Sequence, residues 1–160
     1  MKKIFTLCLL TLICSTFICC GNSQSPNSTE SNLTKKSLTQ SSYEVNTFDQ
    51  ATISDISISD EIISLTFTYS GENQLNLGAW FIVEIYEDGM WYTLPYDIEN
   101  CFDLVAYPVE PNQSKTMEYH LKYVYKSLSA GKYRIITEVS DFVETGNYTD
   151  YYLAAEFEIK

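Results

Sequence analysis

The stretch Leu128-Ser129-Ala130-Gly131-Lys132-Tyr133-Arg134-Ile135 is the part of the sequence that decides the fold. A leucine precedes a short turn at a glycine, and a tyrosine follows two residues later at the start of a strand-like alternation. This order is typical of a tyrosine corner, in which the phenol hydroxyl bonds back to upstream backbone where the chain passes between the two sheets of a sandwich. Leu128, Gly131 and Tyr133 are therefore expected to have structural roles.

Apolar and polar residues alternate in short blocks around this corner, as in an antiparallel sheet with one face in a core. Asp88-Gly89 separates two blocks and supplies the positive φ that a type I′ hairpin requires. The break of phase between Ile53 and Ile56 predicts either a bulge in the first strand or a switch of the chain between sheets. The positions expected to face the core are Ile63, Leu65, Phe67, Tyr69, Met117, Tyr119, Leu121, Tyr123, Tyr133, Ile135, Thr137, Val139, Leu153, Ala155, Phe157 and Ile159.

Two tryptophans fall in neighbouring strands of this pattern. Trp80 lies in residues 79–86, which follow an expected loop over 71–78 and are apolar on both faces, as in a central strand. We expect its indole to fill the core. Trp91 lies in the return strand over 90–94, and we expect it to be structural too. The whole pattern predicts an all-β antiparallel sandwich of about seven to eight strands.

Four features together resemble a bacterial immunoglobulin-like (Big-type) domain over residues 50–160. They are Trp91-Tyr92, the turn over 110–114, the corner over 128–135 and the closing strand over 155–159. The resemblance implies an Ig-like sandwich outside the cytoplasm, with no shared catalytic residues. The cysteine pair of this fold is absent, so hydrophobic packing is expected to hold the two sheets together.

The N-terminus has the pattern of a secretory signal peptide. Lys2 and Lys3 precede an apolar run over 4–18 that is too short to span a bilayer comfortably. The run ends in Cys19-Cys20-Gly21-Asn22, which resembles the lipobox of bacterial lipoproteins. That resemblance implies a signal peptide over 1–19, cleavage after Cys19 and diacylation of Cys20, with Cys19 as the alternative modified residue. Two acyl chains such as palmitate would anchor the protein durably.

Residues 20–49 are rich in Ser, Asn and Thr and show no hydrophobic periodicity. Such a segment buries too little apolar surface to offset the entropy of ordering, so it predicts a flexible tether between the anchor and the domain at 50–160. The expected location is the extracytoplasmic face of the cell membrane, and the expected partners are the membrane and another envelope or surface protein.

Charge and cysteine usage exclude several functions. The net charge of the chain is −11, and loss of Lys2 and Lys3 with the leader would leave 8 basic and 21 acidic residues, a net charge of −13. An acidic surface repels phosphate, so nucleic acid is not expected as a partner. Four of the five cysteines precede residue 21, and Cys101 alone lies in the body, where it is expected to be buried rather than reactive.

The sequence offers little for catalysis. His120, the one histidine, falls on the outward face of its predicted strand, which argues against a histidine triad or a histidine-rich metal site. No phosphate loop, Cys-x-x-Cys pair or His-Glu-x-x-His helix is present. We therefore expect a protein that is not an enzyme and has no cofactor. A hydrolase using acidic loops would need two carboxylates that converge in a cleft.

Two groups of acidic residues are weak candidates for Ca²⁺, which binds six to eight oxygens in flexible geometry. One comprises Asp97, Glu99 and Asp103, and the other comprises Asp141, Glu144 and Asp150. Neither has the regular spacing of a calcium loop, so solvated loop charge is the favoured interpretation and no metal is expected.

Tyrosines near the corner and the last loop form the other candidate site, because exposed aromatic faces stack on sugars or anchor protein partners. The leading hypothesis is a lipid-anchored, non-catalytic Ig-like interaction or spacer module. The alternative is a lipoprotein that binds a glycan or Ca²⁺ through its aromatic or acidic loops. The possible contact residues are Tyr123, Tyr125, Tyr148, Tyr151 and Tyr152.

Overall fold

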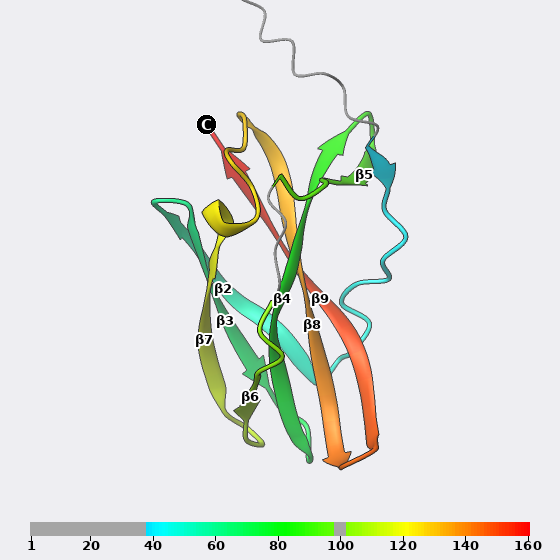
Figure 1. Cartoon of the computed structure of the whole chain (residues 1–160). Coiled ribbons are helices and arrows are strands. Elements are labelled where there is room, and N and C mark those ends of the chain that lie inside the picture. The colour runs from blue at the N-terminus through cyan, green and yellow to red at the C-terminus, as the bar shows by residue number, and fades with distance from the viewer. Residues whose placement is uncertain (1–37, 98–101) are drawn as a thin grey trace, which may run out of the picture. The chain divides into compact units, whose positions relative to one another are not determined.

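The computed structural model describes residues 38–97 and 102–160, and within these ranges the chain forms nine strands and one 3₁₀ turn (Figure 1). The signal peptide, Cys19, Cys20, Glu99 and Cys101 lie outside the described residues. No helix in the described ranges is long and apolar enough to cross a bilayer. The elements are β1 (Thr39–Gln40), β2 (Ala51–Ser59), β3 (Ile62–Tyr69), β4 (Gln74–Glu87), β5 (Met90–Thr93), β6 (Ala106–Val109), β7 (Ser114–His120), η1 (Leu121–Tyr123), β8 (Gly131–Glu144) and β9 (Asn147–Ile159).

The smaller sheet has the order β2-β3-β7, and both pairs are antiparallel. The register of β2 against β3 shifts between Ile53 and Asp55, which confirms the bulge predicted from the phase break. Asp60 and Glu61 both have positive φ, 50° and 65°, and make the tight turn into β3. Each inward side chain of β3 is almost wholly buried, as its alternation predicts.

The larger sheet has the order β1-β5-β4-β8-β9, and β6 also pairs with β4. Asp88 and Gly89, with φ of 50° and 85°, make the hairpin between β4 and β5 that the Asp-Gly pair predicts. The loop expected over 71–78 is wrong for residues 74–78, because β4 begins at Gln74 and pairs there with both β6 and β8. Polar Gln74 and Asn76 had hidden this half of the strand in the sequence.

The hydrophobic core lies between the two sheets and is formed by the inward positions of both. Phe81, Val83 and Ile135 come from the central strands β4 and β8, whereas Leu65 and Phe67 come from β3. Burial of this apolar surface is the main term that favours the folded chain. The all-β antiparallel sandwich predicted from the sequence is therefore confirmed, with nine strands in the described residues where about seven to eight are expected.

The chain crosses from the smaller sheet to the larger one between β7 and β8, at the corner where the sequence places it (Figure 1). Tyr133 is 1% exposed, and its hydroxyl donates a 2.8 Å hydrogen bond to the carbonyl of Ser129. A Cβ at Gly131 would come within 3.2 Å of the Tyr133 ring, so a glycine allows the ring to lie close. Leu128 packs against the core beside them.

Residues 38–48, which we call the strap, correct the predicted tether. The strap begins with β1 on the edge of β5 and reaches β9, where Val45 pairs in parallel with Tyr152 (Figure 1). It ends at Phe48, which is buried and stacks on Tyr151 with ring centroids 4.2 Å apart. The flexible tether predicted over 20–49 is therefore wrong for residues 38–49. Its few anchoring side chains are too widely spaced to give a periodic signal in the sequence.

Candidate functional site

The outer face of the larger sheet carries a second buried layer. Phe81 and Val83 of β4 point into the core, so the residues between and after them point outward. Ile82 and Ile136 are nevertheless 5% and 0% exposed, although they lie outside the core cluster. Glu84, the next outward residue of β4, is 0% exposed. The strap passes over this region, so outward-facing residues here are shielded from solvent.

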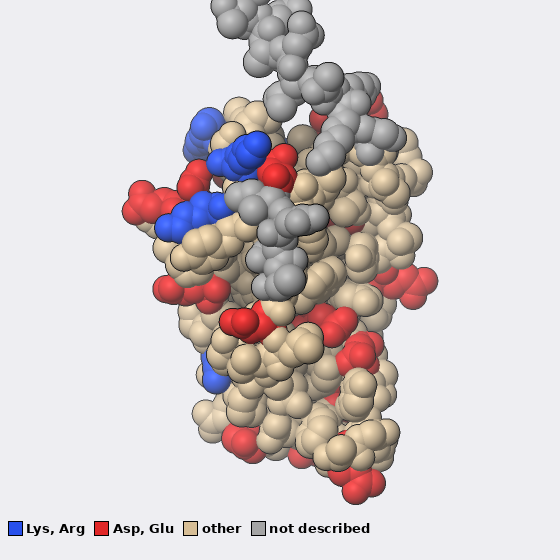
Figure 2. All heavy atoms as spheres, in the orientation of Figure 1, with Lys and Arg blue, Asp and Glu red and all other residues tan. Residues whose placement is uncertain are grey.

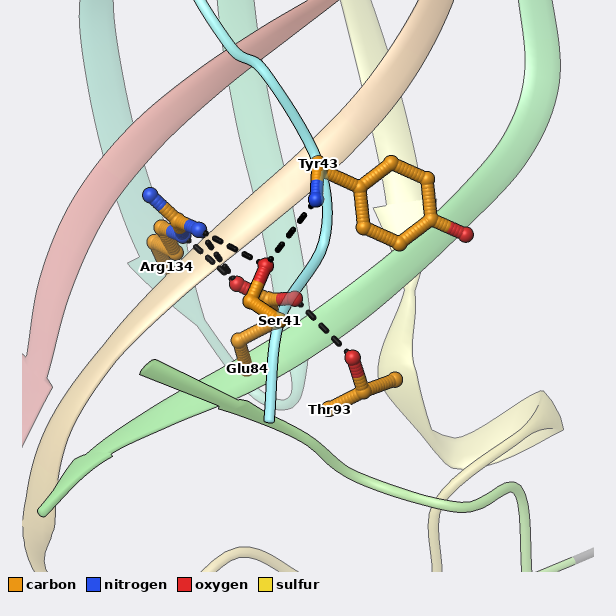
Figure 3. A network of polar contacts seen from close by, with 5 residues as sticks. All are labelled: Ser41, Tyr43, Glu84, Thr93 and Arg134. Atoms are coloured by element: carbon orange, nitrogen blue, oxygen red, sulfur yellow. Dashed lines mark hydrogen bonds and ion pairs between the residues drawn. The ribbon is translucent and has the colours of Figure 1, made fainter. Parts of the chain in front are cut away.

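Glu84 and Arg134 form an ion pair between the central strands β4 and β8 (Figure 3). The Nη2 and Nε atoms of Arg134 lie 2.6 and 2.7 Å from Oε2 of Glu84. Thr93 of β5 donates a 2.9 Å hydrogen bond to the other carboxylate oxygen, Oε1. Arg134 also donates from Nη2 to the hydroxyl of Ser41, 3.1 Å away in the strap. Both oxygens of the buried carboxylate are thus occupied by donors.

Aromatic rings and a lysine continue this network toward the β4–β5 hairpin. The ring of Trp91 lies 4.6 Å from the guanidinium carbon of Arg134, and it also contacts Tyr86 with centroids 4.9 Å apart. The ammonium of Lys132 lies 5.0 Å from the Tyr86 ring and 2.7 Å from the Glu156 carboxylate. The hydrogen bond to Glu156 raises the pKa of Lys132. Trp91 is thus half-buried between charged side chains rather than in the core.

Trp80 occupies the outer face as well, which corrects its expected place in the core. Its indole is partly exposed and packs against Tyr43 of the strap and Tyr152 of β9, with centroids 6.2 and 6.0 Å away. Burial raises the pKa of Tyr43 and of Tyr152, and the charge of Glu138 adds to both shifts. The core position on this strand belongs to Phe81, one residue later.

The five tyrosines proposed as ligand contacts do not form one site. Tyr125 is 2% exposed, and its hydroxyl oxygen accepts the backbone N–H of Val83 at 2.9 Å, so it belongs to the core. Tyr123, expected to face inward, is 60% exposed on η1. Tyr148 is 56% exposed beside the β8–β9 turn, at the end of the domain opposite η1 (Figure 1). Tyr151 and Tyr152 pack against the strap.

The acidic residues proposed for calcium are separated too. Asp150 lies opposite Ser140 in the β8–β9 register, and the Ser140 hydroxyl donates to it at 2.5 Å. Asp141, the next residue of β8, therefore points to the other face. There its carboxylate accepts hydrogen bonds from Asn73 and from the hydroxyl of Tyr69. These two carboxylates do not converge, and within residues 38–97 and 102–160 no group of three possible metal ligands comes together.

His120 is half-buried at the end of β7 and faces the ring of Tyr123, with centroids 5.2 Å apart. Its Nδ1 atom is buried without a hydrogen-bond partner among the described residues. The side chain is therefore less exposed than its outward position in the strand predicts.

A groove of about 440 Å³ opens between β2 and β9, next to the corner. Its apolar wall includes Ile58, which is 39% exposed, while Leu121 and Tyr125 are buried beneath it. Glu61, Ser127, Leu128, Glu158, Ile159 and Lys160 complete the lining. No sequence pattern predicts this groove, because its walls come from three segments far apart in the chain, residues 58–61, 121–128 and 158–160.

Charged side chains are unevenly distributed over the surface. Figure 2 shows acidic side chains from the upper to the lower end of the face in view, whereas most basic side chains in view gather at the upper left. The chain as a whole carries 21 acidic against 10 basic residues. A partner that meets most of this surface therefore meets negative charge.

Comparison with known families gives one match. Residues 42–158 fit the family model of a bacterial Ig-like domain, which covers most of the chain and begins within the strap. Comparisons with curated proteins and with solved structures gave no match.

Proposed function

We propose, from the premise that this chain belongs to the bacterial Ig-like domain family, that it is a lipid-anchored, non-catalytic module displayed outside the cytoplasm to bind another envelope or surface protein. Glu84 is the one charged side chain that is fully buried in the part of the chain that the structure describes, and the way its carboxylate is bound supports a non-catalytic role. Glu84 has both carboxylate oxygens occupied, by Arg134 and by Thr93, so it has no free oxygen to exchange a proton with a substrate.

For the glycan or calcium alternative, the proposed contact residues do not gather in one place among residues 38–97 and 102–160. Tyr151, Tyr152 and Asp150 line a shallow pocket with Tyr43 of the strap, whereas the others lie elsewhere. Tyr125 is used by the core, and Tyr123 and Tyr148 lie at opposite ends of the domain (Figure 1). Asp141 and Asp150 point to opposite faces of the sheet. Among the described residues, the proposed carboxylates therefore offer a cation no multidentate site. The interaction module is therefore the function proposed for this chain.

Lipid anchoring is tested by labelling the full chain in a bacterial host with an alkyne analogue of palmitate, followed by membrane fractionation. We expect wild type and Cys101→Ala to carry the label and to fractionate with the membrane. Cys20→Ala should lose both the label and the membrane association. If Cys20→Ala keeps the label and Cys19→Ala loses it, the acylated residue is Cys19. An unlabelled, secreted wild type would overturn the proposal.

A further inference from the structure

The edge of β9 is only partly covered by the strap. The carbonyl of Tyr152 accepts the N–H of Asn46 at 2.8 Å. The Asn46 side chain donates to the carbonyl of Ala154 at 3.2 Å and accepts its N–H at 2.9 Å. One asparagine thus occupies this part of the edge in the way that a paired strand would. The strap ends two residues later at Phe48, which stacks on Tyr151, and β2 begins at Ala51.

Beyond this point the β9 edge continues without a paired strand in the described parts of the chain. Residues 152 and 154 direct their backbone groups away from β8, and the β8–β9 register is unbroken from there to Ile159. Alternate residues of an antiparallel strand direct their N–H and C=O groups to the same side. Glu156 and Glu158 therefore present two N–H and two C=O groups outward, directly beside the groove.

The side chains around this free edge specify what can pair with it. Phe157 and Ile159 point inward and are part of the core or packed on it, so the neighbouring side chains of an added strand would face the groove and Ile58. Glu156 and Glu158 point to the other face. Glu156 already pairs with Lys132, whereas Glu158 takes part in neither of the ion pairs among the described residues. An added strand would therefore meet Glu158 as an unpaired carboxylate.

We propose that the β9 edge over 156–158 and the groove form a binding site for an extended segment of a protein partner, which adds a strand to the larger sheet. Such a segment presents an apolar side chain to the groove and Lys or Arg opposite the two glutamates. Main-chain hydrogen bonds supply affinity in this mode, and the alternating side chains supply specificity. The inference rests on the proposed interaction function and names its surface and the chemistry of its partner.

A second copy of this chain is disfavoured as the occupant. Antiparallel pairing of two β9 edges around these residues would place Glu156 opposite Glu158, and like charges directly opposite destabilise a strand pair. A strand that carries Lys or Arg opposite Glu156 and Glu158 would instead form favourable cross-strand ion pairs with them. The charge of the edge therefore selects against self-association while leaving its hydrogen-bonding groups available.

The test uses the full chain in detergent and the synthetic peptide acetyl-Lys-Val-Lys-Val-Lys-Val-amide as the probe. We expect saturable binding, and slowed exchange of the backbone amides of residues 156 and 158 in residue-resolved NMR. The matched peptide with Glu in place of Lys should bind at least about tenfold more weakly, because it opposes the edge charge. An N-methylated form of the basic peptide, which lacks the strand donors, should not bind.

The matched variants separate this site from general attraction between the acidic protein and a basic peptide. Glu158→Lys should weaken binding of the basic peptide about tenfold or more. Glu118→Lys makes the same charge change at an exposed position of β7 and should leave binding unchanged. Equal effects of the two variants, or unchanged amide exchange at 156 and 158, would overturn the site. So would a concentration-dependent dimer that protects the same amides. None of these outcomes bears on lipid anchoring, which the labelling experiment tests independently.

Discussion

The larger sheet has a closed side and an open side. The closed side is its outer face, which the strap covers. The open side is the edge of β9 near β2, beside the groove. Under the strap, a buried carboxylate has all its partners within the domain, and even outward-facing Ile82 and Ile136 are shielded from solvent. Beside the groove, Ile58 stays partly exposed and backbone groups of β9 have no paired strand within the described residues. The difference shows that the strap, rather than the alternation of the strands, decides which part of the sheet is accessible.

The largest expected effect comes from opening the closed side at Glu84. Glu84→Ala leaves the guanidinium of Arg134, whose side chain is 12% exposed, without its carboxylate. Loss of one partner from a buried ion pair costs about 3–5 kcal/mol of unfolding free energy, which urea denaturation measures. Glu118→Ala, at an exposed position, should leave the midpoint unchanged. An equal loss of unfolding free energy in Glu84→Ala and Glu118→Ala would show that the buried carboxylate contributes no more than an exposed one.

The second effect is a loss of stability at alkaline pH, caused by a tyrosine buried in the core. Burial raises the pKa of Tyr119 to about 12, because its ionised form is disfavoured between the sheets. Above the ordinary pKa near 10 the unfolded chain loses this proton first, so the free energy of unfolding falls as pH rises from about 10 to about 12.

For this one group the loss amounts to about 2–3 kcal/mol at pH 12. Urea midpoints measured across this range should fall less steeply in Tyr119→Phe than in wild type. Tyr123→Phe, at an exposed position, is the matched control. An unchanged slope in Tyr119→Phe would show that this hydroxyl is not sealed from solvent.

The third effect tests the corner beside the open side. Tyr133→Phe removes the hydroxyl that donates to the Ser129 carbonyl at 2.8 Å. Because the ring is buried and otherwise preserved, we expect a loss of about 1 kcal/mol, measured as a lower melting temperature. A melting temperature equal to that of wild type would contradict a stabilising role for the corner bond.

The smallest effect should come from the strap residue that covers the β9 edge. Asn46 has φ of 58°, a conformation that glycine also adopts, so Asn46→Gly removes both side-chain bonds to Ala154 without backbone strain. We expect a loss of about 0.5 kcal/mol, because both hydrogen bonds are exposed to solvent, and faster hydrogen exchange of the Ala154 amide. The amide of Ile135, buried in β8, is the internal reference. Unchanged exchange at Ala154 would mean that the edge is covered by other contacts.

Much of the fold follows from local pattern. The inward residues of β3 and β8, the Asp88-Gly89 hairpin and the Tyr133 corner each depend on signals within a few residues of one another. Such signals state which face of a strand is buried and where the chain turns. They can be read from the sequence because the alternation of a strand depends only on residues that are neighbours in the chain.

The remainder depends on contacts between distant segments. Trp80 was expected in the core because both faces of its strand are apolar, yet the outer face is apolar because the strap covers it. Glu84 looks like an ordinary surface carboxylate in the sequence, since its partner Arg134 is fifty positions away. The edge at Glu158 has no sequence signal at all, because an unpaired strand edge exists only once the strand order is known.

The order in which the strap meets the domain has a mechanical consequence. A pull applied on the N-terminal side of residue 38 loads the two-residue β1 first, then the Ser41 contact with Arg134, and then Asn46 on β9. Phe48, the first residue of the strap in the core, bears load only after these have yielded. Tension from that end would therefore break the contacts of the strap one after another before it loaded the sandwich. The outer face of the larger sheet would be uncovered while the core between the two sheets stayed packed.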